Sequence, residues 1–263
     1  MNLGLKGKSV IVMASSKGLG KATALEFAKA GAHVIISSRT ETDLKKTEKD
    51  IKNLTGNPKV TFRVCDVTDP AAIKDLVQFT VNTYGTVDVL INNSGGPPAG
   101  NFDAFDDTSW QQAFELTLLS YVRTIREVLP YMRKQQRGHI VNFASSSTKQ
   151  PINNLTLSNV FRVGVTGLSK SLAIELGPHN ILVNTISPGR IATDRIQELN
   201  EGRAKNLGMS IEKLIQQSEA EIALGRFGQP EEFGKIVTFL CSEANTYMTG
   251  QSIIIDGGLV KAI

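Results

Sequence analysis

A glycine-containing turn near the N-terminus is the first group of residues with an evident chemical use. Residues 14–20 (ASSKGLG) join a short apolar run to a stretch with helical spacing. Gly18 and Gly20 let the backbone approach a ligand closely, and the helix that follows directs free N–H groups and a partial positive charge at it. Such a turn alone also fits an ordinary strand-to-helix connection, but the chemistry it offers is phosphate binding.

Polar residues follow other apolar runs of the chain. Asp66 follows the third run, residues 92–95 (NNSG) the fourth and residues 187–189 (SPG) the sixth. If these runs are parallel strands, their carboxyl ends meet at one edge of a sheet, and open α/β sheets bind ligands at that edge. These residues therefore strengthen the prediction of a phosphate-containing ligand.

The elements that must position these residues alternate along the chain. Helical stretches separate seven apolar runs, at residues 9–13, 32–37, 59–64, 87–92, 139–143, 181–186 and 252–255. This pattern predicts an α/β fold of the Rossmann type, a doubly wound, seven-stranded parallel sheet with helices on both faces. No linker, repeat or low-complexity segment interrupts it. Residues 1–263 are therefore expected to form a single dinucleotide-binding domain.

Composition excludes several other classes of function. The 263 residues are 41% hydrophobic and carry a net charge of only +4, with Lys and Arg scattered, which argues against a nucleic-acid partner. Cys65 and Cys241 lie far apart, so we expect no metal site and no disulfide framework. No apolar run has the length of a membrane span or a signal core. We expect a soluble, cytoplasmic protein that acts on a small molecule.

Several motifs together resemble the short-chain dehydrogenase/reductase family, in particular its 3-oxoacyl-(acyl-carrier-protein) reductases. Residues 14–20 match the family's Gly-x-x-x-Gly-x-Gly with Ala14 in the place of the first glycine, and residues 92–95 resemble its Asn-Asn-Ala-Gly. The remaining landmarks lie at residues 177–184 (GPHNILVN), 187–189 (SPG), 225–232 (GRFGQPEE) and 256–258 (DGG). The resemblance covers essentially the whole chain.

The resemblance implies a set of cofactor-binding residues. Asp66 and Val67 would contact adenine, Asn93 to Gly95 the adenosine ribose, and Pro188 to Thr193 the nicotinamide side. The full expected set is Ala14, Ser16, Lys17, Gly18, Leu19, Gly20, Ser38, Arg39, Asp66, Val67, Asn93, Ser94, Gly95, Arg162, Pro188, Gly189, Ile191 and Thr193.

Charge at the end of the second strand predicts which dinucleotide binds. Enzymes that select NAD place a carboxylate there to bind the ribose 2′-hydroxyl, whereas a 2′-phosphate needs cations. This chain has Ser38 and Arg39 at that point, and Lys17 would face the same phosphate from the glycine turn. We therefore expect NADP(H) to be preferred, with NAD(H) still possible.

The catalytic residues of the family are largely replaced. Counting from residues 140–145 (IVNFAS) and from residues 167–173 (GLSKSLA) gives the same frame. By that likeness the family's serine falls on Ser145, its tyrosine on Ser158, its lysine on Arg162 and its helix asparagine on Thr117. These four residues are the catalytic candidates, and only Ser145 keeps the family's residue type.

These replacements change the expected acid–base chemistry. A phenol has a pKa of about 10 that a nearby ammonium lowers toward neutrality, whereas an alkyl hydroxyl such as Ser158 is far less acidic. Arg162 still offers donors to the nicotinamide ribose and a positive charge, and Ser145 with Ser158 could polarise a substrate oxygen. Tyr121, one helical turn after Thr117, either points toward the site as a replacement acid or packs between helices, and packing is the favoured interpretation.

Two segments are expected to shape the substrate pocket. Residues 95–100 (GGPPAG) would form a defined wall, and residues 190–228 would form a mobile helical lid. A long helix from Thr108 to about Gln136 is expected to take part in subunit contact. The resemblance implies a homotetramer or dimer.

Two functions fit the sequence, and they belong to different classes. The leading hypothesis is an NADP(H)-dependent oxidoreductase that acts on a carbonyl or hydroxyl substrate, 3-oxoacyl-like by resemblance, through an atypical proton path. The alternative is an NADP(H)-binding protein without turnover, such as a sensor, scaffold or partner subunit. A Rossmann domain without any dinucleotide conflicts with the retained glycine turn, Asp66, Asn93 and Thr193.

Overall fold

Seven parallel strands form the centre of the molecule. The computed structural model describes residues 3–262, with the backbone only at residue 206. The strands lie in the order β3-β2-β1-β4-β5-β6-β7, and each neighbouring pair is parallel. Their bounds are β1 (Ser9–Val12), β2 (His33–Ser38), β3 (Val60–Val64), β4 (Val89–Asn92), β5 (Gly138–Phe143), β6 (Ile181–Pro188) and β7 (Ser252–Ile255). The predicted doubly wound, seven-stranded parallel sheet is confirmed.

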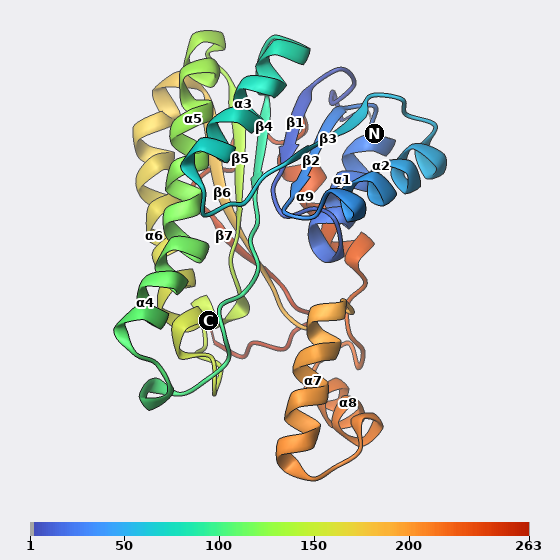
Figure 1. Ribbon diagram of the computed structural model, residues 1–263, viewed down its shortest axis with the longest axis vertical. Coiled ribbons are helices and arrows are strands. Elements are labelled where there is room, and N and C mark those ends of the chain that lie inside the picture. The colour runs from blue at the N-terminus through green and yellow to red at the C-terminus, as the bar shows by residue number, and fades with distance from the viewer. Residues whose placement is uncertain (1–2, 263) are drawn as a thin grey trace.

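Helices cover both faces of this sheet (Figure 1). One face carries α1 (Gly18–Lys29), α2 (Glu41–Thr55) and α9 (Pro230–Leu240). The opposite face carries α3 (Pro70–Tyr84), α5 (Ser120–Gln135) and α6 (Thr156–Leu176). Short 3₁₀ turns lie at Phe102–Ala104, Ser146–Thr148 and Gly177–His179. This two-sided cover explains why the strands are almost continuously apolar.

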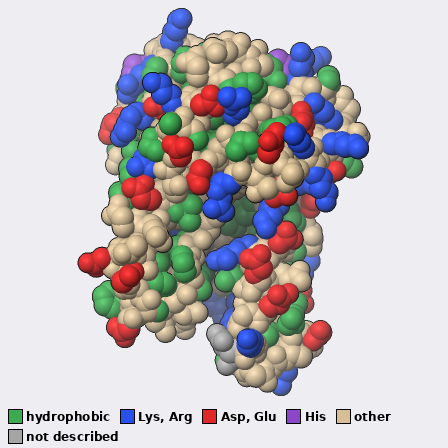
Figure 2. Space-filling model, viewed as in Figure 1, with side chains coloured by type: hydrophobic (Ala, Val, Ile, Leu, Met, Phe, Trp, Pro, Cys, Tyr) green, Lys and Arg blue, Asp and Glu red, His purple; other side chains and the backbone are tan. Residues whose placement is uncertain are grey.

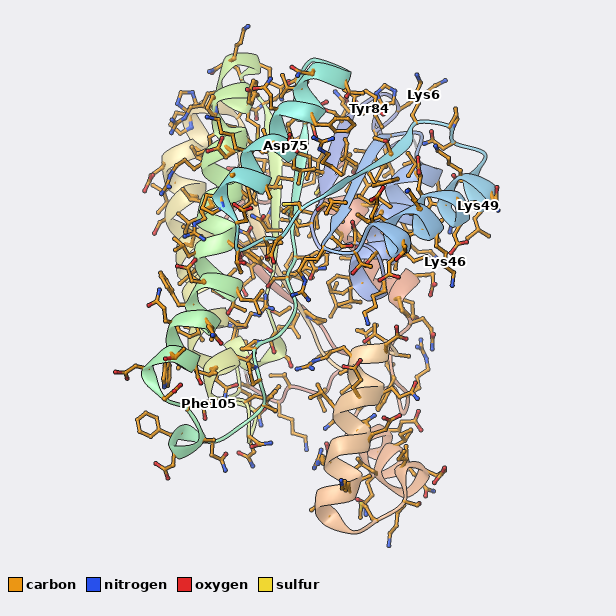
Figure 3. All side chains as sticks on the ribbon, viewed as in Figure 1. Lys6, Lys46, Lys49, Asp75, Tyr84 and Phe105 are labelled. Carbon is orange, nitrogen blue, oxygen red and sulfur yellow. The ribbon has the colours of Figure 1, made fainter. Side chains whose placement is uncertain are left out.

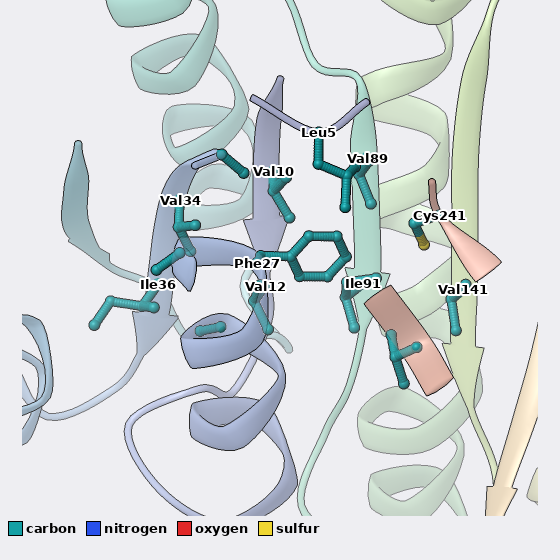
Figure 4. Close-up of a cluster of buried hydrophobic side chains, with 14 of the residues drawn as sticks. Leu5, Val10, Val12, Phe27, Val34, Ile36, Val89, Ile91, Val141 and Cys241 are labelled. Carbon is teal, nitrogen blue, oxygen red and sulfur yellow. The ribbon is translucent and has the colours of Figure 1, made fainter. Parts of the chain in front are cut away.

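Successive residues of each strand enter two separate cores. Val10 and Val12 of β1 face α1 and α9, where the Phe27 ring fills the centre of the cluster (Figure 4). Ile11 of β1 and Ile35 of β2 face the other side, toward α3 and α5. The two hydrophobic cores, one on each face of the sheet, hold the strands in register, and the carboxyl ends of the strands therefore form one edge of the sheet.

The long helix predicted from Thr108 to about Gln136 is not a single α-helix. It consists of α4 (Asp107–Phe114), a π-helical turn (Glu115–Leu119) and α5. The Thr117 hydroxyl donates to the Ala113 carbonyl at this turn. A side chain that bonds its own helix in this way and a π turn both disturb the regular ladder, which the hydrophobic spacing of the sequence does not reveal.

A pair of helices projects from the carboxyl edge of the sheet. They are α7 (Asp194–Leu207) and α8 (Ile211–Ala220), and Figure 1 shows them apart from the main layers. Thr193 caps α7 and Ser210 caps α8, each through a side-chain oxygen that accepts from a backbone N–H. They lie within residues 190–228, where a helical lid was expected. The lid role itself stays a prediction.

A histidine at the opposite edge of the sheet gives the fold a pH dependence. His139 lies in β5, and its Nδ1 has no hydrogen-bond partner among residues 3–262. Burial lowers the pKa of His139 from 6.5 to about 4, with Lys8 acting in the same direction and Asp88 and a backbone bond to Leu240 opposing it. Burial of this ring therefore favours its neutral form in the folded protein.

Acid is expected to destabilise the protein through His139. Between pH 6.5 and about 4 the unfolded chain binds a proton at this ring that the folded chain does not, so the free energy of unfolding falls as the pH is lowered. The contribution is on the order of 2 kcal/mol. Urea unfolding at several pH values should show a smaller acid-induced loss in His139→Gln than in the unaltered protein. Equal losses in both proteins would contradict this assignment.

Candidate functional site

The turn between β1 and α1 has the geometry of an anion-binding loop. Ala14 and Gly18 both have left-handed backbone conformations, with φ of 46° and 58°. Helix α1 begins at Gly18, inside the turn, with Lys17 as its N-cap. No side chain caps this helix. Its first N–H groups therefore remain available to a phosphate.

Gly20 packs against the loop that follows β4. A Cβ at Gly20 would lie 2.5 Å from the Ala14 carbonyl oxygen and 3.0 Å from Nδ2 of Asn93. The same Asn93 amide donates to the Ala14 carbonyl at 3.0 Å. This contact ties the glycine turn to the segment at residues 93–95, so two predicted cofactor segments are in direct contact.

Replacing Gly20 by alanine is expected to lower dinucleotide affinity at least about tenfold, since the new Cβ displaces the Ala14 carbonyl and Asn93. Titration with dinucleotide and thermal unfolding measure the two consequences. Gly167→Ala is the matched control, because a Cβ there meets nothing within 4 Å and the residue lies inside α6. If Gly20→Ala binds as the unaltered protein does, the close approach at this turn has no role in binding.

The ends of β2 and β3 form the predicted adenosine side. Lys17 and Arg39 are both exposed and form no ion pair within the described part of the chain. The Ser38 hydroxyl is buried and has no hydrogen-bond partner there either. Burial raises the pKa of Asp66, but hydrogen bonds from Thr68 and the charge of Arg39 outweigh it and leave the pKa below the ordinary value. Asp66 is therefore a carboxylate that Arg39 faces.

The segment after β6 lies beside the glycine turn. A Cβ on Gly18 would come within 3.9 Å of the Thr193 side chain. Gly189 has no room for a side chain, since a Cβ there would lie 2.4 Å from that of Asp256. Ile191 is buried and pairs with Gly228 through an isolated bridge. The structure thus brings residues 14–20, 93–95 and 188–193 to one edge, as predicted.

The remaining predicted cofactor residues have structural contacts at the same edge. Leu19 and Val67 pack partly buried against the two cores. The Ser16 carbonyl accepts from Thr47 of α2. Gly95 is exposed, and a Cβ there would meet nothing within 4 Å.

Two serine hydroxyls lie at the start of the predicted catalytic region. Ser145 follows β5, is partly exposed and accepts from the Ser147 N–H at 3.1 Å. Ser158 is the third residue of α6 and is also partly exposed, and its hydroxyl forms no hydrogen bond within residues 3–262. The 3₁₀ turn after Ser145 contacts α6. Both hydroxyls can donate to a substrate oxygen, and neither has the acidity of a phenol.

Thr117 is placed differently from the other candidates. It is fully buried in the π-helical turn, and its hydroxyl is bound to the Ala113 carbonyl. Its side chain is therefore already satisfied within its own helix. A catalytic role for Thr117 rests on the backbone of this turn, since π turns are frequent at functional sites.

Arg162 is the most unusual group of the site. Only 6% of the residue is exposed, although α6 places it one turn after Ser158 on the same face. Nη1 donates to the Phe143 carbonyl at 2.7 Å and to the Tyr121 hydroxyl at 2.9 Å, while Nη2 lies 3.5 Å from Oγ of Ser94. No carboxylate of the described chain lies within ion-pair distance of it.

Tyr121 combines the two interpretations that the sequence left open. It packs in a small cluster with Ala144 and Val165 and is 1% exposed, as the favoured packing interpretation requires. Its hydroxyl nevertheless reaches the site, where it contacts Arg162 and donates to the Phe143 carbonyl at 3.0 Å. Helical spacing placed Tyr121 on the right face, whereas the contact with Arg162 depends on tertiary packing.

A hollow separates the sheet edge from the projecting helices (Figure 2). Arg195 of α7 reaches across to the loop after β4, where Nη2 lies 3.4 Å from the Pro97 carbonyl. Arg190 contacts Ser218 and Glu221 of the α8 region, and burial lowers its pKa. At the other side of the loop, Phe105 packs on Gly100 (Figure 3). These contacts fix the two ends of residues 95–100, and their role as a wall of the substrate pocket stays a prediction.

Residues 3–262 contain neither a cluster of metal-ligating side chains nor a membrane-spanning helix. No group of three or more His, Cys, Asp or Glu side chains within residues 3–262 could hold a metal ion. No helix in that part of the chain has both the length and the apolar character needed to cross a bilayer.

Comparison with known proteins agrees with this geometry. A family model described as enoyl-(acyl carrier protein) reductase matches residues 13–260. The 3-oxoacyl-(acyl-carrier-protein) reductase FabG of Thermotoga maritima is 36% identical over 256 residues, 97% of this chain and 99% of the relative. The NADPH-dependent reductase BacG of Bacillus subtilis is 31% identical over 256 residues, with 97% and 99% covered. L-Sorbose reductase from Gluconobacter frateurii, complexed with NADPH and L-sorbose, aligns over 100% of both chains with a TM-score of 0.94 and 32% identity. The chain belongs to the short-chain dehydrogenase/reductase family.

Proposed function

We propose that this protein is an NADP(H)-dependent oxidoreductase that acts on a carbonyl or hydroxyl group. The observation that carries the proposal is the set of three segments, residues 14–20, 93–95 and 188–193, that meet at the carboxyl edge of the sheet. Full-length relatives named as reductases, among them an NADPH-dependent one, support it. A 3-oxoacyl compound is the first substrate class to examine.

The residues present fit a dinucleotide, and NADP(H) better than NAD(H). Gly20 and the uncapped start of α1 leave room and donors for a pyrophosphate. Lys17, the buried Ser38 hydroxyl and Arg39 supply donors and positive charge for a ribose 2′-phosphate. The Asp66 carboxylate beside this subsite already accepts from Thr68. NAD(H) would offer no phosphate to Lys17 and Arg39, and Arg39 would then face only Asp66.

The chain's own groups then determine the chemistry at the substrate oxygen. When bound, the nicotinamide would supply or accept a hydride at the substrate carbon. The Ser145 and Ser158 hydroxyls would donate hydrogen bonds to the substrate oxygen and so stabilise the negative charge that develops there. Arg162 would add positive charge beside this oxygen but would not release a proton, because a guanidinium stays protonated. The final proton must therefore come from water through a serine hydroxyl.

The alternative function is a dinucleotide-binding protein without turnover. One observation favours it: within residues 3–262 the phenol that reaches the site is that of Tyr121, which is buried and directs its proton at the Phe143 carbonyl. An NADP(H)-bound state would then serve as a signal or as a scaffold. Both functions require the same cofactor, so they differ only in turnover.

A titration followed by a substrate panel separates the two functions. NADPH is expected to bind with higher affinity than NADH, as measured by the change in nicotinamide fluorescence. Absorbance of the nicotinamide would then report turnover with 3-oxoacyl thioesters, diketones, keto sugars and the corresponding alcohols. NADPH binding with no turnover on any substrate would support the non-catalytic function. Failure to bind either dinucleotide would overturn both.

We further propose that the protein is a cytoplasmic homo-oligomer, a tetramer or a dimer. A shallow apolar depression on α5 and α6, which includes Val122, Leu129 and Leu172, supports self-association through these helices. Cys65 and Cys241 are free and buried, which fits a reducing compartment. Light scattering measures the mass of the assembly directly, and a monomer at micromolar concentration would contradict this proposal.

A further inference from the structure

A buried cation without an acidic partner lies next to the proposed nicotinamide subsite. Only 6% of Arg162 is exposed. Removing a guanidinium from water is costly unless acceptors satisfy it, and a carboxylate is the usual partner. Here the acceptors are neutral oxygens contributed by β5, α5 and the loop after β4. The positive charge of Arg162 therefore has no neutralising partner within residues 3–262.

The contacts of Arg162 fix which of its donors stay available. Nη1 is engaged by the Phe143 carbonyl and the Tyr121 hydroxyl, at 2.7 and 2.9 Å. A guanidinium has five N–H donors in one rigid plane, so fixing Nη1 orients the remaining edge. That edge, with Nη2, faces Ser94, which lies between the cofactor residues Asn93 and Gly95.

Tyr121 cannot itself be the missing acid in this arrangement. Its hydroxyl is the acceptor of one Arg162 hydrogen bond and the donor of another to the Phe143 carbonyl. With 1% exposure it has no access to the hollow where a substrate would bind. The Arg162 carbon Cζ also lies 6.0 Å from the centre of the Tyr121 ring, a distance at which the ring stabilises the cation.

We infer that Tyr121 and Ser94 are positioning residues, which hold the Arg162 guanidinium so that its free edge binds the ribose on the nicotinamide side of the dinucleotide. This inference rests on the proposed function and deepens it. The side chains of Arg162, Tyr121 and Ser94 act together. An arginine at position 162 can reach Tyr121 and Phe143 with one nitrogen and still present other donors, whereas a lysine has only a single donor atom.

The test compares the affinities of the protein for two ligands that share the adenosine half of the dinucleotide. NADPH occupies both halves of the site, whereas adenosine 2′,5′-bisphosphate occupies only the adenosine half. Tyr121→Phe is expected to lower the affinity for NADPH about tenfold, the loss of one hydrogen bond to a charged group. The affinity for the bisphosphate should not change. Ser94→Ala should also lower the affinity for NADPH, by about threefold, because its contact with Arg162 is long. Ser94 lies in the segment expected to contact the adenosine ribose, so only Tyr121→Phe separates the two ligands.

A second pair of variants tests whether Tyr121 acts through Arg162. In an Arg162→Lys background, Tyr121→Phe should have little further effect on NADPH affinity, since the partner it positions has gone. Tyr131→Phe is the matched control, the same change on the same helix at a partly buried position outside the site. It should leave both affinities unaltered.

The outcomes are distinguishable. Equal losses for NADPH and the bisphosphate would show general structural damage and overturn the inference. No loss for NADPH in Tyr121→Phe, or the same loss with Lys at position 162, would also overturn it while leaving the proposed function intact. If the unaltered protein binds the bisphosphate but not NADPH, the nicotinamide side is not a ligand site and the inference fails. Binding of neither ligand would overturn the proposed function as well.

Discussion

Arg39→Asp is expected to lower the affinity for NADPH about 100-fold and to leave that for NADH unchanged or raised. Arg39 follows β2, is exposed and has its charge within reach of Asp66. A hydrogen bond from a guanidinium to a phosphate contributes about 2 kcal/mol, and the new carboxylate adds repulsion of the 2′-phosphate. The same carboxylate accepts from the 2′-hydroxyl of NADH. Isothermal titration with both dinucleotides measures the two affinities.

The control for Arg39→Asp is a variant with the same change of charge at a position far from the 2′-phosphate subsite. Lys49 lies exposed on α2, and Figure 3 shows it on the outer surface of the same side of the molecule. Lys49→Asp makes the same kind of charge reversal and should weaken NADPH binding by less than about threefold, since solvent and salt screen its effect. If Arg39→Asp behaves like Lys49→Asp, selectivity for the 2′-phosphate does not reside at Arg39.

The fold and the cofactor edge were predictable because their signals are local. Each strand is an apolar run of a few residues, and the polar residues that follow it, such as Asp66 and Asn93, need only the rule that parallel strands end at one edge. The burial of Val10 and Val12 on one face and Ile11 on the other follows from the alternation of side chains along a strand. Tertiary packing does not have to be known for any of these conclusions.

The contacts inside the site were not predictable, since they join residues far apart in the sequence. Asn92 and Asn142 are linked by a buried hydrogen bond, and Asn142 in turn donates to Ser169. These side chains fix the ends of β4 and β5 beneath the site, yet no spacing pattern announces them. Arg162 is a similar case. Counting from the motifs on either side placed it at the family's lysine position, but its burial against Tyr121 and Ser94 could not be predicted.

The interrupted helix shows a second reason for such failures. Apolar spacing continues through residues 115–119, so the sequence predicts one helix from Thr108 to about Gln136. The π turn depends on how α4 and α5 each dock, and it inserts one residue without changing composition. It also removes the Thr117 hydroxyl from the set of groups that can reach a substrate directly.

Restoring the family's residues at three positions is expected to produce the largest change in activity. The triple variant Ser158→Tyr, Arg162→Lys, Thr117→Asn should reduce carbonyl substrates at least about 100-fold faster than the unaltered protein, because a general acid contributes about 10²- to 10⁴-fold. The phenol would stand on the partly exposed first turn of α6, and the ammonium one turn later would lower its pKa. Rates of NADPH oxidation with simple diketones measure the gain.

Two controls assign that gain to the phenol. Arg162→Lys with Thr117→Asn alone should show no increase, since Ser158 is then still an alkyl hydroxyl. Adding Ser145→Ala to the triple variant should remove most of the gain, because Ser145 would hold the substrate oxygen beside the new tyrosine. A triple variant that binds NADPH but reduces no diketone would contradict the expectation. The hollow between the sheet edge and α7 would then exclude such substrates from the catalytic residues, and the retained cofactor site would serve binding rather than turnover.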